Sequence, residues 1–211
     1  MEFLSEPLTK YIENHSSKEP TALYELYRET NLKAINPIML SGHLQGRFLS
    51  MLVHLIKPKL ILELGTYTGY SAICLAEGLP SDSKIISVDR NEELFYLAKK
   101  YFEKSGVSDK IELMVGNAMD IIPKLDLEFD MVFIDADKLN YLNYYHLIID
   151  KVKQNGLILA DNILWYGKVV TDDSGADTLA LKAFNEFVQN DPRVENVLMP
   201  LRDGMMMIRK L

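Results

Sequence analysis

The chain has 211 residues, of which 48% are hydrophobic and 25% are charged, so it can bury the core of one α/β domain. A formal net charge of −7 disfavours nucleic acid as the main partner, because phosphate binding depends on clustered lysines and arginines. No apolar run reaches membrane-spanning length, so no membrane partner is expected, and the single cysteine, Cys74, excludes an intramolecular disulfide. We therefore expect a cytoplasmic protein.

The first part of the chain is predicted to be helical. Helices are expected over residues 3–15, 21–33 and 41–56, with Ser41 as a candidate N-cap for the third. They would form an N-terminal extension over residues 1–57, joined to an α/β core over residues 58–211 within a single domain.

The core alternates short apolar runs with helical or loop segments, which is typical of parallel βαβ units. The runs cover residues 60–64, 85–88, 111–115, 130–134 and 156–160. After them, residues 194–200 and 205–209 are predicted to form an antiparallel hairpin around an Asp-Gly turn. The sequence therefore predicts a mostly parallel sheet that ends in a hairpin.

The segment 61–76 predicts a strand, a glycine loop and then an amphipathic helix. Glu63 precedes Gly65 and Gly69, and this spacing differs from the Gly-x-Gly-x-x-Gly of dinucleotide-binding loops. The carboxylate would repel phosphates and suits an ammonium or a sulfonium. S-adenosylmethionine is the simplest such ligand, and a nicotinamide dehydrogenase is the least favoured alternative. Asp89, at the end of the second run, is expected to bind ribose hydroxyls.

Polar side chains follow the fourth and fifth runs, where ligands of parallel sheets bind. Asp135, Asp137 and Lys138 come after the fourth run, and Asp161 and Asn162 after the fifth. Asp135, Asp161 and Asn162 offer only oxygen ligands, which suits Mg²⁺, with Ca²⁺ or Mn²⁺ as alternatives. The plainer interpretation is that Asp161 and Asn162 only cap a helix or form a turn.

Lys138 is a candidate for the group that takes a proton from a phenol, because a nearby cation lowers the pKa of a lysine. Its alternative is a surface lysine that pairs with Asp137. Trp165 and Tyr166, just after the candidate metal pair, are candidates for a wall of the substrate site. The tyrosines at 141, 144 and 145 are predicted mainly to pack along a helix.

Together these motifs resemble the cation-dependent O-methyltransferases, the family of catechol O-methyltransferase and caffeoyl-coenzyme A O-methyltransferase. Leu-Glu-Leu-Gly-x-Tyr-x-Gly-Tyr-Ser-Ala is similar to the cofactor loop of the catechol enzyme. Asp-Ala-Asp-Lys and Ala-Asp-Asn-x-Leu-Trp are similar to the caffeoyl-coenzyme A pattern. The resemblance, closest to bacterial members, implies a Rossmann-like class I methyltransferase fold. That fold has a central, mostly parallel seven-stranded sheet, a C-terminal antiparallel hairpin and extra N-terminal helices.

The resemblance also assigns residues to the site. It implies that Lys138 and Asp135 are catalytic and that Asp135, Asp161 and Asn162 bind the metal. The positions that match cofactor contacts are Met39, Ser41, Glu63, Gly65, Tyr67, Gly69, Tyr70, Ser71, Asp89, Ala118, Asp135 and Asp137.

The implied reaction is an SN2 methyl transfer from S-adenosylmethionine to a small vicinal-dihydroxy phenol of the catechol or hydroxycinnamate type. Two alternatives remain, 5-hydroxyuridine of transfer RNA as the substrate and a non-catalytic module that binds S-adenosylmethionine. A homodimer through the N-terminal helices is expected from the family.

The chain departs from the family at two points. Residues 197–200 hold no acid before the final turn, unlike the catechol enzyme, and Tyr166 stands where the plant enzyme has an asparagine. Neither substrate can therefore be carried over.

Overall fold

The computed structural model describes residues 5–211, and the chain divides into two compact units, one ending at Gly116 and the other running from Asn117 to Leu211. Residues 3 and 4 of the first predicted helix lie outside the described residues. Among the described residues, no helix is long and apolar enough to cross a membrane.

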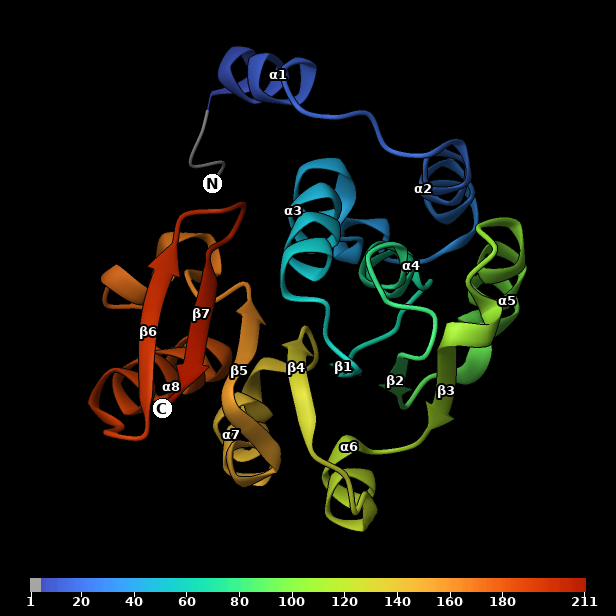
Figure 1. The fold of residues 1–211 in the computed structure, drawn as a ribbon. Helices are drawn as coiled ribbons and strands as arrows, with labels where there is room; N and C mark the ends of the chain where they lie inside the picture. Colours follow the sequence, from blue (N-terminus) through green and yellow to red (C-terminus); the bar gives the residue numbers. More distant parts are fainter. Residues whose placement is uncertain (1–4) are drawn as a thin grey trace. The chain divides into compact units, whose positions relative to one another are not determined.

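Within the described residues, the unit that ends at Gly116 has five α-helices and three parallel strands. The strands lie in the order β3-β2-β1 (Figure 1). The strands pair without a register shift, and Leu62 of β1 lies opposite Ile86 of β2, which lies opposite Glu112 of β3. The helices are α1 (Glu6–Asn14), α2 (Thr21–Lys33), α3 (Gly42–Ile56), α4 (Tyr70–Glu77) and α5 (Phe95–Lys104), and the strands are β1 (Leu60–Leu64), β2 (Lys84–Asp89) and β3 (Ile111–Val115). Short 3₁₀ turns cover Pro37–Met39, Glu92–Leu94 and Ser108–Lys110.

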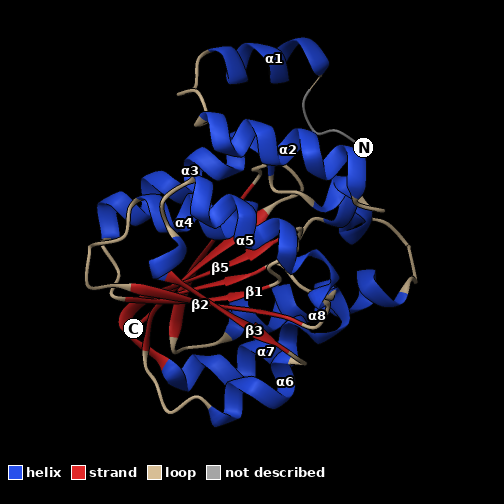
Figure 2. Ribbon diagram, turned by 90° about the vertical axis from the view of Figure 1, so that its right-hand side faces the viewer, coloured by secondary structure: helices blue, strands red, loops and turns tan. Residues whose placement is uncertain are grey.

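Helix α4 is buried almost all round, so the expectation of an amphipathic helix is wrong. Every residue from Tyr70 to Ala76 is buried. The helix packs against α3 as well as β2, and α4 and α5 lie on one side of β1, β2 and β3 in Figure 2. An amphipathic pattern would need one face in water, and here α3 covers that face.

Helix α2 is tied to α5 by ion pairs. Glu29 of α2 accepts from Lys100 Nζ at 2.5 Å and from the Tyr101 hydroxyl at 2.8 Å, and Glu25 pairs with Lys104. Within α2, Thr30 also donates to the Thr68 hydroxyl at 3.1 Å. The contacts of Glu25 and Glu29 hold α2 against α5. The Thr30 hydrogen bond joins α2 to the loop between β1 and α4.

The second unit has the strand order β4-β5-β7-β6. Strands β4 and β5 are parallel, whereas β7 runs antiparallel to both β5 and β6 (Figure 1). The elements are α6 (Ala118–Ile121), β4 (Phe129–Ile134), α7 (Tyr141–Ile148), β5 (Val152–Asp161), α8 (Ala176–Asn190), β6 (Val194–Met199) and β7 (Met205–Lys210). Short 3₁₀ turns cover Ile122–Lys124, Lys138–Asn140, Ile149–Lys151 and Trp165–Val170.

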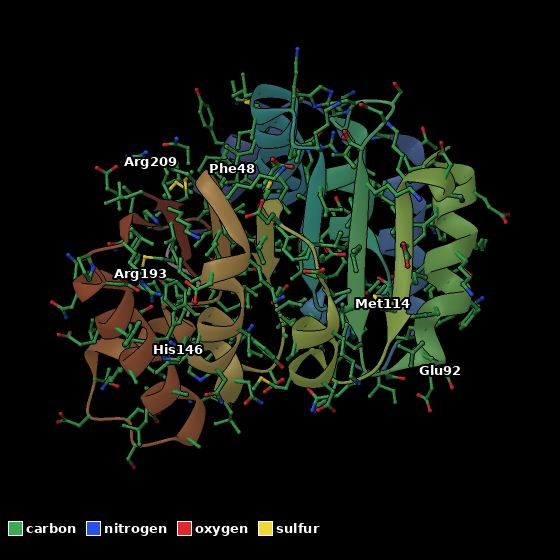
Figure 3. The ribbon with its side chains drawn as sticks, turned by 60° about the horizontal axis from the view of Figure 1, so that its bottom comes forward. Phe48, Glu92, Met114, His146, Arg193 and Arg209 are labelled. Atoms are coloured by element: carbon green, nitrogen blue, oxygen red, sulfur yellow. The ribbon has the colours of Figure 1, made fainter. Side chains whose placement is uncertain are left out.

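The C-terminal hairpin lies against the end of β5. Met205 is paired with Asp161 on β5 and with Met199 on β6. On the same hairpin Arg209, labelled in Figure 3, donates to Glu195 at 2.7 Å across the two strands. The hairpin and the mostly parallel seven-stranded sheet confirm the predicted fold class. Strand β5 begins earlier than predicted, at Val152 instead of residue 156.

Candidate active site

The glycine loop between β1 and α4, residues 65–69, has a backbone that few side chains permit. Gly65, Tyr67 and Gly69 all have positive φ, at 102°, 49° and 86°. A Cβ on Gly69 would lie 2.6 Å from Cε1 of Phe102, so the loop presses directly on α5. Only glycine combines this dihedral with so close an approach.

Glu63 ends up deep inside the first unit. Its side chain is fully buried on β1, and its Oε2 accepts a hydrogen bond from the Ser87 hydroxyl. The Ser87 hydroxyl in turn bonds the Thr66 hydroxyl at 2.6 Å. The Ser87 hydroxyl therefore holds the carboxylate, and the Thr66 hydroxyl of the loop holds Ser87 in turn. Neither residue is part of the predicted site.

Asp89 organises the glycine loop from the end of β2. Its Oδ2 accepts from the backbone N–H of Tyr67 at 2.8 Å, and its Oδ1 accepts from Asn91 N–H at 2.9 Å. The Tyr67 hydroxyl donates to the carbonyl of Asn36 at 2.9 Å, which brings the segment before α3 onto the loop.

The other predicted cofactor residues of this unit differ in exposure. Ser41 and Ser71 are buried, whereas Met39 is 56% exposed. The Tyr70 hydroxyl donates to Glu19 Oε2 at 2.5 Å, and burial raises the pKa of Tyr70 above its usual value.

In the second unit, a chain of hydrogen bonds links the ends of β4 and β5. We call Asp135, Lys138, Tyr141 and Asp161 the Lys138 cluster. Lys138 Nζ donates to Asp135 Oδ1 at 3.1 Å and to the Tyr141 hydroxyl at 2.6 Å. The Tyr141 hydroxyl donates to the backbone carbonyl of Asp161 at 2.9 Å. The cluster thus joins three predicted site residues through a tyrosine that was predicted mainly to pack along a helix.

Lys138 is not a surface lysine paired with Asp137, so that alternative is wrong. Its side chain is only 10% exposed, and its acidic partner is Asp135. Asp137 instead accepts from Asn140 Nδ2 at 2.6 Å and from the Tyr144 hydroxyl at 2.5 Å.

The charges around Tyr141 are strongly negative. Burial raises the pKa of Tyr141 well above its usual value, and the carboxylates of Asp135, Asp161 and Asp137 raise it further. A cation bound beside these carboxylates would offset their mutual repulsion.

The candidate metal ligands are hard oxygen donors. Asp161 is 1% exposed, and its Oδ1 accepts from the backbone N–H of Asn162 at 2.8 Å. Asn162 has a φ of 60°, a conformation that asparagine tolerates better than most residues. Among the described residues, no three His, Cys, Asp or Glu side chains are gathered as for a metal ion. The predicted set holds two carboxylates and the amide of Asn162, so it is not a set of that kind. Its role as a metal site stays a prediction.

The loop after β5 is fastened to the turn of the C-terminal hairpin. Trp165 and Tyr166 both have positive φ, and their ring centroids lie 5.5 Å apart. The backbone N–H of Tyr166 donates to Asp203 Oδ1 at 2.6 Å, and that of Leu164 donates to the Asp203 carbonyl at 2.9 Å. A Cβ on Gly204 would clash with Leu164 Cγ, so turn and loop are in close contact.

A family model described as O-methyltransferase matches residues 13–211. The chain belongs to the O-methyltransferase family. It is similar to caffeoyl-CoA O-methyltransferase 5 of Nicotiana tabacum, with 36% identity over 98% of this chain and 92% of the relative. It is also similar to the caffeoyl-CoA O-methyltransferase of Eucalyptus gunnii, with 38% identity over 98% and 88%.

Solved structures of methyltransferases that contain SAM or SAH match nearly the whole chain. The SAH-bound methyltransferase PaMTH1 of Podospora anserina has a TM-score of 0.89 and 30% identity, covering 97% of this chain and 94% of its own. The O-methyltransferase TomG of Streptomyces achromogenes, in complex with SAM, has a TM-score of 0.87 and 27% identity, covering 97% and 96%. The protein is therefore an S-adenosylmethionine-dependent O-methyltransferase.

Besides Ser87 and Thr66, Tyr141 and Asp203 of this O-methyltransferase had no place in the predicted site. Tyr141 lies three residues after Lys138, a spacing at which side chains meet on a helix, and that spacing could have found it. Asp203 was interpreted only as part of an Asp-Gly turn. Ala118 is buried at the start of α6, and its contact with the cofactor stays a prediction, as does the homodimer.

Proposed function

We propose that this O-methyltransferase methylates one hydroxyl of a vicinal-dihydroxy phenol of the hydroxycinnamate or catechol type, with the help of a divalent cation. The relatives named caffeoyl-CoA O-methyltransferases, 36–38% identical over nearly the whole chain, support the substrate class. The Lys138 cluster carries the proposal, because it joins a buried amine to the Asp135 carboxylate after β4 and, through Tyr141, to the backbone carbonyl of Asp161 at the end of β5.

Asp135, Asp161 and Asn162 would hold the cation. Their donor atoms are all oxygens, and two of them bear negative charge, which fits Mg²⁺ better than a soft metal. Burial raises the pKa of Tyr141, the carboxylates of Asp135, Asp161 and Asp137 raise it further, and a bound cation would offset the part due to the carboxylates. When bound, the cation supplies positive charge that lowers the pKa of a nearby phenol.

Lys138 would position the reacting hydroxyl and take its proton. Its Nζ is held by Asp135 and Tyr141, so the amine has one defined place. In this proposal Nζ first gives a proton to solvent and then accepts the phenol proton. The phenolate oxygen bonds to the methyl carbon while the carbon–sulfur bond breaks and sulfur keeps the electron pair.

Residues of the other unit would hold S-adenosylmethionine. Asp89 keeps the glycine loop in shape through Tyr67 N–H and is proposed to bind the ribose. Glu63, the buried carboxylate fixed by Ser87, is proposed to attract the ammonium of the methionine end. Trp165 and Tyr166 would form a wall for the aromatic substrate.

The test measures transfer of a labelled methyl group to a panel of phenols that includes caffeoyl-CoA, caffeate and catechol. We expect transfer to at least one vicinal diphenol, loss of transfer with EDTA and recovery with Mg²⁺. Lys138→Ala should lower kcat by about 10²-fold or more, the scale of a lost acid–base group. Transfer that is unaffected by both EDTA and Lys138→Ala would contradict the mechanism.

The alternatives are outcomes of the same assay. Hypomodified transfer RNA included in the panel would be labelled if 5-hydroxyuridine were the substrate. Binding of S-adenosylmethionine with no transfer to any acceptor would favour a non-catalytic module.

A further inference from the structure

Two side-chain hydrogen bonds join the N-terminal part of the chain to the glycine loop and to the residue that follows it. Thr30 of α2 donates to the Thr68 hydroxyl of the loop at 3.1 Å. The hydroxyl of Tyr70, the first residue of α4, donates to Glu19 Oε2 at 2.5 Å. Residues that precede the α/β core in the sequence therefore hold side chains on both sides of Gly69.

The conformation of the loop calls for such support. Tyr67 has a φ of 49°, and a side chain in this region persists only where its surroundings hold it. Asp89 holds Tyr67 from the end of β2 through the backbone N–H. The Asn36 carbonyl accepts from the Tyr67 hydroxyl at 2.9 Å, which adds a further contact from the N-terminal part of the chain.

The packing of α2 does not by itself explain the Thr30 hydroxyl. Helix α2 packs against both α4 and α5 (Figure 2), and its Leu23 and Leu26 are fully buried. Thr30 and Thr68 are fully buried as well, and a pair of valines has nearly the same shape and needs no hydrogen bond. What the two hydroxyls add is a directional contact between α2 and the loop.

Glu19 makes its contact from the linker between α1 and α2, 51 positions before Tyr70 in the chain. Tyr70 is 2% exposed, so its hydroxyl needs a partner inside the protein. Burial and the neighbouring Glu19 carboxylate both raise the pKa of Tyr70, so the phenol keeps its proton and remains a donor. The linker is thereby tied to the start of the helix that follows the loop.

We propose that Thr30 and Glu19 are positioning residues for the cofactor, which hold the glycine loop, through Thr68 and Tyr70, in the conformation that binds S-adenosylmethionine. This inference rests on the proposed function, which places the cofactor on this loop. The helices before the core are then part of the cofactor site. Loss of either contact raises the dissociation constant of the cofactor, and the methyl transfer step at saturating cofactor is unaffected.

Calorimetric titration of the full-length variants Thr30→Val and Glu19→Ala with SAH tests the inference. Each variant loses one hydrogen bond to the loop or to α4, so its Kd for SAH should rise about 3–10-fold. Glu19→Gln should recover most of the affinity, because its amide oxygen still accepts from the Tyr70 hydroxyl. The KM for S-adenosylmethionine should rise in parallel while kcat stays near the wild-type value. A merely structural role would lower the folded fraction, and with it kcat, without raising KM.

Glu25→Ala is the matched control on α2. It removes the ion pair with Lys104 of α5, which does not involve the loop, so the Kd for SAH should stay as in the wild type. Thr68→Val tests the route of the effect. Since Thr30 acts through Thr68, adding Thr30→Val to Thr68→Val should raise the Kd no further. Thermal unfolding shows that each variant is folded.

Three results overturn the inference. The first is a wild-type Kd in folded Thr30→Val and Glu19→Ala. The second is an equal rise in Glu25→Ala, which would assign the effect to general loosening of α2. The third is a Kd in the Thr30→Val, Thr68→Val double variant that multiplies the two single effects.

Asp89→Ala separates this inference from the proposed function. If Asp89→Ala weakens SAH binding but Thr30→Val and Glu19→Ala do not, the cofactor does bind at the loop and only the inference fails. If all three variants bind SAH as the wild type does, the proposed place of the cofactor fails, and the inference fails with it.

Discussion

Tyr141→Phe tests the Lys138 cluster at its least expected member. The substitution removes only the hydroxyl and keeps the buried ring. This ring packs edge-on against Phe184, with 5.6 Å between the ring centroids. Lost with it are the bond from Lys138 at 2.6 Å and the bond to the Asp161 carbonyl at 2.9 Å. The first is a bond to a charged group, so the two together are worth about 2–4 kcal/mol of unfolding free energy.

Activity should fall as well, because among the described residues Lys138 then keeps its hydrogen bond to Asp135 and loses the one to the hydroxyl. We expect kcat to drop about tenfold or more, since a catalytic amine that is free to move loses its alignment. Urea unfolding measures the stability, and labelled methyl transfer to a vicinal diphenol measures the rate.

Tyr145→Phe is the matched control on the same helix. The Tyr145 hydroxyl is also buried, but it donates to Asp191 at 2.9 Å, and it takes no part in the cluster. Because Asp191 is a carboxylate, its loss should cost about 1.5–3 kcal/mol, and it should leave kcat unchanged. A wild-type kcat/KM in Tyr141→Phe, or an equal loss of activity in both variants, would refute the reasoning.

Two further predictions concern the first unit. Gly69→Ala should weaken S-adenosylmethionine binding and destabilise the fold by about 1–3 kcal/mol, because its Cβ would meet Phe102 at a positive φ. Gly106→Ala, also at positive φ but with open space around its Cβ, should cost less and leave calorimetric cofactor binding intact. Hydrogen bonds from Lys100 and Lys33 lower the pKa of Glu29 to about 2, below its usual 4.5. Its contribution to stability is therefore full above 4.5 and is lost as the pH falls toward 2, and urea unfolding of Glu29→Gln should show a weaker fall over that range. An equally steep fall in the variant would rule out this role.

The sequence predicted the sheet well because its strands are short apolar runs with clear ends. The run at 60–64 coincides with β1, and the Asp-Gly pair lies in the hairpin turn as expected. Strand β5 begins four residues early because Lys153, Gln154 and Asn155 are polar, and an apolar run does not reveal them. Helix α4 was misjudged because its covering comes from α3, a tertiary contact that local periodicity does not encode.

The sequence predicted which polar residues follow the strands of the site, but it did not predict the hydrogen bonds that join them. Asp135, Lys138 and Asp161 could be named from their place after apolar runs. The Tyr141 hydroxyl that joins them could not, since a tyrosine on a helix normally packs into the core. The contact of Asp203 with the loop after β5 was missed for a different reason. An aspartate before a glycine is already explained by the turn, so nothing in the sequence indicated a further role.

The central claim is that methyl transfer depends on a divalent cation held by Asp135, Asp161 and Asn162. It is tested most directly by titrating metal-free protein with Mn²⁺, with bound ion read by electron paramagnetic resonance and methyl transfer to a vicinal diphenol measured in the same samples. The account predicts about one bound ion per chain, activity that rises in proportion to occupancy, and loss of both in Asp161→Ala. Metal-free protein that transfers the methyl group at the full rate would contradict it.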